Sequence, residues 1–83
     1  MDAILDALWS RWEDYKASGS DDEVAIGLAT IDTFNHYGVY DTYDALEEGR
    51  TKALNSHETE LLTQALSRIQ PTLEMMIEPE SGW

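Results

Sequence analysis

The spacing of apolar residues constrains the fold of this chain more than any other feature of its sequence. In four segments, apolar side chains recur at intervals of three and four residues, the period of an α-helix with one buried face. In the first segment the recurring residues are Ile4, Leu5, Leu8, Trp12 and Tyr15, with Trp9 beside them. No segment predicts a strand with comparable support. The pattern therefore predicts an all-α protein, a small compact bundle of about four short helices.

Residues that favour helix termini mark the ends of the first two segments. Asp2 is an N-cap type at the start of the first helix, which should end near Ala17, before "SGS". The second helix opens with "SDDE", in which Ser20 and Glu23 have the spacing of a capping box, and Gly38 fits a C-cap. Between them, the uncharged run "VAIGLATI" predicts the most buried helix of the bundle.

The third and fourth segments each carry one residue that disfavours a helix. The third helix is predicted to begin at Asp41 as its N-cap, and Gly49 argues against a continuous helix. The fourth is predicted to begin at Asn55 or Ser56, and Pro71 predicts a kink or a restart within it, because proline lacks the amide hydrogen. The predicted apolar stripes are Val39, Tyr43, Leu46, Ala53 and Leu54 in the third helix, and Leu62, Ala65, Ile69, Leu73 and Met76 in the fourth, with Leu61 and Leu66 at the edges.

The length of 83 residues predicts a single helical domain, residues 1–77, followed by a frayed tail, residues 78–83. A domain of this size buries only about 60–65% of the surface of its unfolded chain, so a homodimer would add to a modest stability. The sequence has no cysteine, so neither disulfides nor thiolate metal sites reinforce the core. This composition suits a reducing cytoplasm.

The chain is strongly acidic, with 17 Asp and Glu against 5 Lys and Arg and a net charge of −12. Direct binding to nucleic acid needs a basic surface, and the few basic residues are scattered. The charge also disfavours anionic lipid, and no uncharged run approaches the roughly 20 residues that span a bilayer. The start "MDAILDALW" carries an acid where a signal peptide carries bases. These observations predict a cytoplasmic protein that binds neither nucleic acid nor membrane.

Residue patterns that support catalysis, metal binding or cofactor binding are missing from the sequence. His36 and His57 are far apart, and "HETEL" lacks the second histidine of the zinc protease motif. The acidic runs "DDEVAIG" and "DTYDALEEG" lack the spacing of a calcium-binding loop. Paired carboxylates could hydrolyse a glycoside only in a cleft that a bundle of this size rarely provides. We therefore predict a protein that is not an enzyme and that has no metal or cofactor.

The segment "DTYDALEEG", residues 41–49, holds four acids and no base. On a helix, Asp41, Asp44 and Glu48 follow i, i+3 and i+7, with Glu47 alongside. Asp41 and Asp44 suit the start of a helix, whereas Glu47 and Glu48 have no such role. Two tyrosines flank these acids, and aromatic residues often anchor protein interfaces. The predicted partner-binding residues are Tyr40, Asp41, Tyr43, Asp44, Glu47 and Glu48.

Three interpretations of the acidic charge are open at this point. Carboxylates on one helix face imitate a row of phosphates, so the protein would occupy the Lys/Arg surface of a basic, nucleic-acid-handling protein and exclude nucleic acid. In size, charge and lack of cysteine, the chain resembles the small inhibitors that phages encode, including DNA mimics and anti-CRISPR proteins, and such a protein would act in the host cytoplasm. This likeness is compositional, and no motif assigns a family. The second interpretation is the solvated surface of a halophilic protein, and the third is a helical adaptor or scaffold subunit whose apolar stripes bind a partner.

Overall fold

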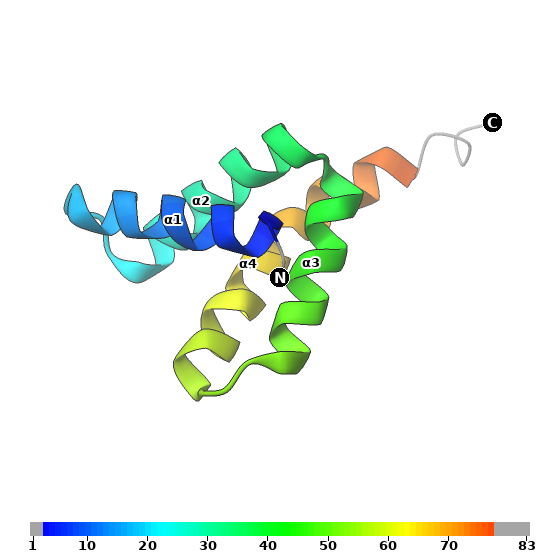
Figure 1. Cartoon of the computed structure of the whole chain (residues 1–83). Coiled ribbons are helices and arrows are strands. Elements are labelled where there is room, and N and C mark those ends of the chain that lie inside the picture. Colours follow the sequence, from blue (N-terminus) through cyan, green and yellow to red (C-terminus); the bar gives the residue numbers. More distant parts are fainter. Residues whose placement is uncertain (1–2, 78–83) are drawn as a thin grey trace.

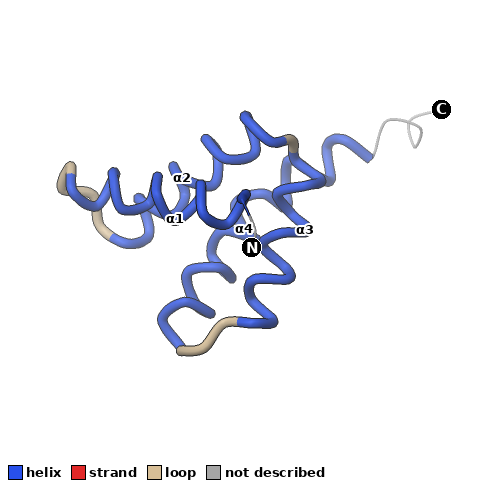
Figure 2. The backbone as a smooth tube through the Cα atoms, in the orientation of Figure 1, coloured by secondary structure: helices blue, strands red, loops and turns tan. Residues whose placement is uncertain are grey.

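The computed structural model describes residues 3–77, which form four α-helices and contain no strand (Figures 1 and 2). Helix α1 spans Ala3–Ala17, α2 spans Asp22–Tyr37, α3 spans Val39–Lys52 and α4 spans Ser56–Ile77. Helices α1 and α2 form one antiparallel pair, α3 and α4 form a second, and α2 also packs against α4 (Figure 1). The prediction of a small all-α bundle is confirmed, while the predicted cap Asp2 and the predicted tail 78–83 lie outside the described residues.

Helix α4 supplies half of the buried apolar residues, and its apolar stripe packs against α2 and α3. The predicted stripe is confirmed at Leu62, Ala65, Ile69 and Leu73, which are at most 8% exposed. The side chain of Met76 lies outside what the structure describes. Both edge residues of this stripe are also buried, and the other helices add Leu8, Ile26, Ala29 and Leu46 to the same cluster. In α1, Leu8 alone is fully buried, and the predicted partners Leu5, Trp9, Trp12 and Tyr15 pack half-buried against the cluster.

The uncharged run of α2 has one buried face and one exposed apolar face. Its buried face carries mainly small residues, which allow neighbouring helices to approach: Ala25, Ile26, Gly27, Ala29, Thr30 and Thr33. The hydroxyl groups of Thr30 and Thr33 donate hydrogen bonds of 2.7 Å to backbone carbonyls one turn earlier, so their burial leaves no polar atom unsatisfied. Three larger apolar side chains, Val24, Leu28 and Ile31, are 38–45% exposed. The run therefore forms a buried helix with an exposed apolar stripe.

The predicted cap at the start of α2 is wrong, and the predicted cap at its end is confirmed. Asp21, not Ser20, is the N-cap, and its carboxylate accepts a hydrogen bond of 2.9 Å from the backbone N–H of Val24. The helix therefore starts one residue later than the predicted capping box requires. Gly38 ends the helix as predicted, and its φ of +99° lies in a region that side chains disfavour. This single residue connects α2 to α3, so the turn between them depends on glycine.

Helix α3 begins earlier and continues further than the sequence predicted. It starts at Val39, with Gly38 at the N-cap position and no side-chain cap, so the prediction that Asp41 caps this helix is wrong. The helix continues through Gly49 to Lys52, so Gly49 does not interrupt it. Gly49 is buried against α1, and a larger residue at this position would meet the side chain of Leu5.

The connection between α3 and α4 corrects one further prediction. Leu54, which was assigned to the apolar stripe of the third helix, is 93% exposed because the helix ends at Lys52. Asn55 precedes α4, and its side-chain carbonyl accepts a 2.8 Å hydrogen bond from the backbone N–H of Glu58, which confirms the predicted cap. Helix α4 continues through Pro71, so the proline does not restart it.

Candidate protein-binding surface

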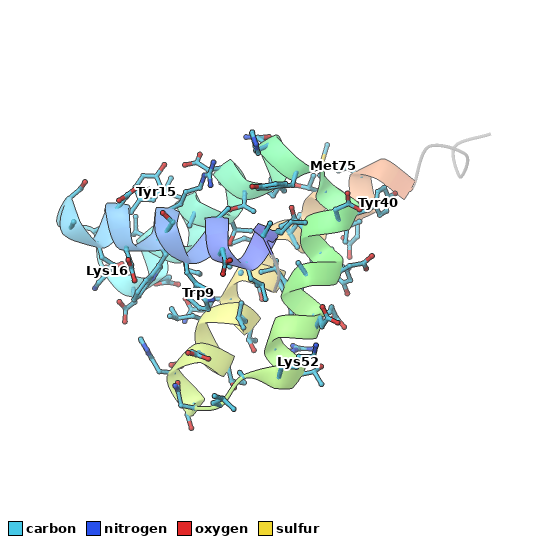
Figure 3. All side chains as sticks on the ribbon, in the orientation of Figure 1. Trp9, Tyr15, Lys16, Tyr40, Lys52 and Met75 are labelled. Atoms are coloured by element: carbon cyan, nitrogen blue, oxygen red, sulfur yellow. The ribbon has the colours of Figure 1, made fainter. Side chains whose placement is uncertain are left out.

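The four acids of α3 lie on the side of the helix that faces away from the core. The buried side of α3 carries Thr42, Ala45, Leu46 and Gly49. The acids instead surround one shallow hollow of about 540 Å³, together with Thr51 and with Ile4 of α1. In Figure 3, oxygen-tipped side chains project from α3 away from the other helices between Tyr40 and Lys52. We call Asp41, Asp44, Glu47 and Glu48 the α3 acidic face.

Of the first two acids of this face, only Asp41 lies close to the positive end of the helix dipole. Asp41 is in the first turn of α3, where a negative charge is favourable even without a cap hydrogen bond. Asp44 follows almost one turn later. Neither carboxylate forms an ion pair with another residue in the range 3–77. Both are therefore available to a basic group from outside the chain.

Glu47 and Glu48 have local partners that the sequence reasoning missed. A carboxylate oxygen of Glu47 lies 3.6 Å from the guanidinium of Arg50, and one of Glu48 lies 3.5 Å from the ammonium of Lys52. These spacings of three and four residues are common ion-pair geometries on a helix. All four side chains are at least 40% exposed, so each pair contributes only about 0–1 kcal/mol. The sequence reasoning assigned these two acids no role at the start of a helix, and the structure gives each of them an ion pair within α3.

The two tyrosines next to the acids have different environments. Tyr40 is half exposed near the start of α3, where its ring is accessible to a partner (Figure 3). Tyr43 packs against the core. The negative charge of Glu47, together with a hydrogen bond to that carboxylate, raises the pKa of Tyr43 above its ordinary value. Tyr43 thus lies beside Glu47 and packs into the bundle, whereas Tyr40 lies on the surface.

The hollow beside the α3 acidic face continues across the molecule. A second hollow of about 780 Å³ shares Ile4 and Glu48 with the first, and runs between the start of α1, the end of α3 and the start of α4. A third cavity shares Trp9 and Glu58 with the second. Because adjacent hollows share lining residues, they lie side by side, and each has at least one carboxylate in its lining. We call this row of three hollows the groove.

Two aromatic residues of this groove were assigned by the sequence to the core alone. Trp9 and Trp12 pack against the core, but both also line the third cavity, beside His57 of α4. The spacing of the two tryptophans indicated a common helix side. Their approach to His57 could not be inferred, because it depends on how α1 packs against α4.

The remaining chemistry of the described residues is limited. Residues 3–77 contain no group of three or more acidic, histidine or cysteine side chains placed to hold a metal ion. His36 packs edge-on against Tyr37, with ring centroids 4.6 Å apart, and His57 contacts Asp22. Among residues 3–77, no helix combines the length and the apolar character that crossing a membrane requires.

Comparison of the chain with protein-family models, curated proteins and solved structures returns no match. Any functional conclusion therefore depends on the surfaces described above.

Proposed function

We propose that this protein is a non-enzymatic binding protein that engages a basic, nucleic-acid-handling protein through the α3 acidic face. It would act in the cytoplasm, and it would compete with nucleic acid for a Lys/Arg surface of the partner. One observation carries this proposal: Asp41, Asp44, Glu47 and Glu48 surround a single exposed hollow on one side of α3. Tyr40 provides an exposed aromatic ring near one end of the same face.

The linear density of charge on α3 supports mimicry of a nucleic-acid strand. An α-helix rises about 1.5 Å per residue, so the four acids span about 10 Å of helix axis. One strand of B-DNA carries about three phosphates over the same distance. Four carboxylates on one helix face therefore match a phosphate strand in charge per unit length.

The ion pairs of Glu47 and Glu48 present only a small obstacle to such binding. A basic partner must displace Arg50 and Lys52 or accept their presence at the edge of the contact. Because exposed pairs contribute about 0–1 kcal/mol each, a clustered Lys/Arg surface would outweigh them. The unpaired Asp41 and Asp44 provide the part of the face that needs no rearrangement.

The test uses a charge reversal on the face and a matched reversal away from it. The test variant is Glu47→Lys with Glu48→Lys, and the control is Glu60→Lys with Glu74→Lys on α4, which changes the net charge equally. The unmodified protein is immobilised, and proteins retained from a lysate of its host cell are identified by mass spectrometry. We expect a nucleic-acid-binding protein that duplex DNA or RNA displaces. The test variant should bind it at least about tenfold more weakly at low salt, because like charges then face each other across the contact.

Two results would contradict the proposal. One is equal binding by the test variant and the unmodified protein at low salt, while circular dichroism shows that both remain helical. The other is a retained partner that nucleic acid does not displace. The first of these results would mean that the α3 acidic face is only a solvated surface.

A second candidate function is supported by the exposed apolar stripe of α2. Val24, Leu28 and Ile31 follow i, i+4 and i+7, so they form one continuous strip on the surface of the bundle. This strip favours an adaptor or scaffold role, in which the acids only keep the protein in solution. Binding would then persist in molar salt and in the charge-reversal variant. It would be lost when Leu28 and Ile31 are replaced by serine.

A further inference from the structure

The end of the groove opposite the α3 acidic face is an aromatic cavity between α1 and the start of α4. The rings of Trp9 and Trp12 are nearly perpendicular, at 87°, with centroids 5.9 Å apart. The imidazole of His57 lies 6.3 Å from Trp12, at 65°. The cavity has a volume of about 270 Å³, and its lining consists of Asn55 at the edge together with Trp9, Trp12, Glu13, His57, Glu58 and Leu61. We refer to these residues as the aromatic cavity.

Local structure holds the side chains of the aromatic cavity in place. On α1, Trp9, Trp12 and Glu13 have spacings of three and four residues, which place them on one side of the helix. On α4, the cap formed by Asn55 sets the position of the first turn and thus of Glu58. His57 is 3.2 Å from the carboxylate of Asp22, which connects α4 to the start of α2. The cavity is therefore built from one side of α1 and the first turns of α4, with the cap residue Asn55 at its edge.

The charge around the cavity is negative. Glu13 and Glu58 contribute two carboxylates, and no lysine or arginine lines the cavity. Lys16, also on α1, is paired with Asp22 at 2.7 Å. That ion pair, together with His57, lowers the pKa of Asp22, so this carboxylate stays ionised and keeps Lys16 occupied. Among residues 3–77, no lysine or arginine forms an ion pair with Glu13 or Glu58.

We propose that the aromatic cavity binds the side chain of a single arginine from a partner protein. The faces of tryptophan rings attract cations, and arginine makes such contacts more often than lysine. A planar guanidinium also forms paired hydrogen bonds with carboxylates, which Glu13 and Glu58 supply. The volume is below the roughly 300–1,000 Å³ of sites for drug-sized molecules and suits one side chain. This inference goes beyond the proposed function, because it concerns a different surface and does not require the α3 acidic face.

The test follows the indole N–H resonances of Trp9 and Trp12 during titration with single-residue probes. The probe is N-acetyl-arginine N-methylamide, and its matched control is the citrulline counterpart, which has a similar shape but no charge. We expect saturable shifts of both indole resonances with the arginine probe, with a dissociation constant on the order of millimolar for so small a ligand. The citrulline probe should cause no saturable shift.

Paired variants separate specific binding from general attraction to an acidic protein. Replacing both cavity glutamates, Glu13→Gln with Glu58→Gln, should weaken binding of the arginine probe by about tenfold. The control, Asp14→Asn with Glu60→Gln, removes the same charge from neighbouring positions outside the cavity and should leave the affinity unchanged.

Three outcomes would overturn the proposal: equal shifts with citrulline, unchanged affinity in the cavity variant, or an equal loss in the control variant. The probes and variants leave the α3 acidic face unmodified. Failure here would therefore not affect the proposed function, and failure of the proposed function would not affect this result.

Discussion

Replacing Gly49 with alanine sets two effects of known size against each other. Within a helix, alanine is favoured over glycine by about 1 kcal/mol. A Cβ atom at Gly49 would, however, lie 2.8 Å from Cδ1 and 3.2 Å from Cδ2 of Leu5, closer than normal carbon contacts. Overpacking of this kind costs about 1–3 kcal/mol. We therefore expect Gly49→Ala to lower the free energy of unfolding by up to about 2 kcal/mol, despite the better helix propensity.

Gly27 of α2 provides a matched control for this prediction. A Cβ atom there would lie 2.9 Å from Nε and 3.1 Å from Cζ of Arg68, which form the end of a long, exposed side chain. Because this side chain can move into solvent, the propensity gain should prevail. We expect Gly27→Ala to raise the free energy of unfolding by up to about 1 kcal/mol.

Urea denaturation followed by circular dichroism measures both variants, and a double-mutant cycle with Leu5→Ala identifies the cause. If the contact with Leu5 is responsible, Gly49→Ala should stabilise the Leu5→Ala protein by about 1 kcal/mol while destabilising the parent. For a domain of this size, about 1 kcal/mol corresponds to a shift of about 4–8 °C in Tm. The reasoning is refuted if Gly49→Ala stabilises both backgrounds to the same extent.

Three further predictions follow from the caps, the charge and the tyrosines. Asp21→Ala should destabilise the protein by about 1 kcal/mol through its lost cap, whereas Ser20→Ala and Asp41→Ala should each cost no more than about 0.5 kcal/mol. Thermal melts of the three variants measure these losses, and equal losses would contradict the assignment of Asp21 as the cap. The isolated protein should fold at ordinary ionic strength, with salt adding a modest stabilisation by screening repulsion, and a chain that folds only in molar salt would favour the halophile interpretation. The hydrogen bond of 2.5 Å from the Tyr15 hydroxyl to Asp32 raises the pKa of Tyr15 above 10.0, so the free energy of unfolding should fall as the pH rises past that value. Urea melts between about pH 8 and pH 11 should show a smaller fall for Tyr15→Phe, and an identical fall in both proteins would show that this tyrosine is not the cause.

Part of the candidate surface could be predicted from the sequence alone. The spacing of Asp41, Asp44 and Glu48 placed them on one helix side, and the structure shows them around one hollow. Their use as a partner-binding site stays a prediction. The ion pairs of Glu47 and Glu48 were predictable in principle, because both partners lie within four residues on the same helix. The aromatic cavity was not predictable, because Trp12 and His57 belong to helices that are distant in the sequence.

The sequence by itself determined that the chain forms helices, where α1 and α2 end, where α4 begins and which side of α4 is buried. These properties depend on local periodicity, on caps such as Asn55 and on the backbone freedom of Gly38. Only the tertiary structure decided which apolar residues of α2 are exposed, why Gly49 is compatible with a continuous helix and which hollows join into a groove. The physical reason is that a helix pattern specifies a direction for each side chain, but not the neighbour that it meets. Small residues on α2 and α3 allow close packing, and that packing leaves Val24, Leu28 and Ile31 on the outside.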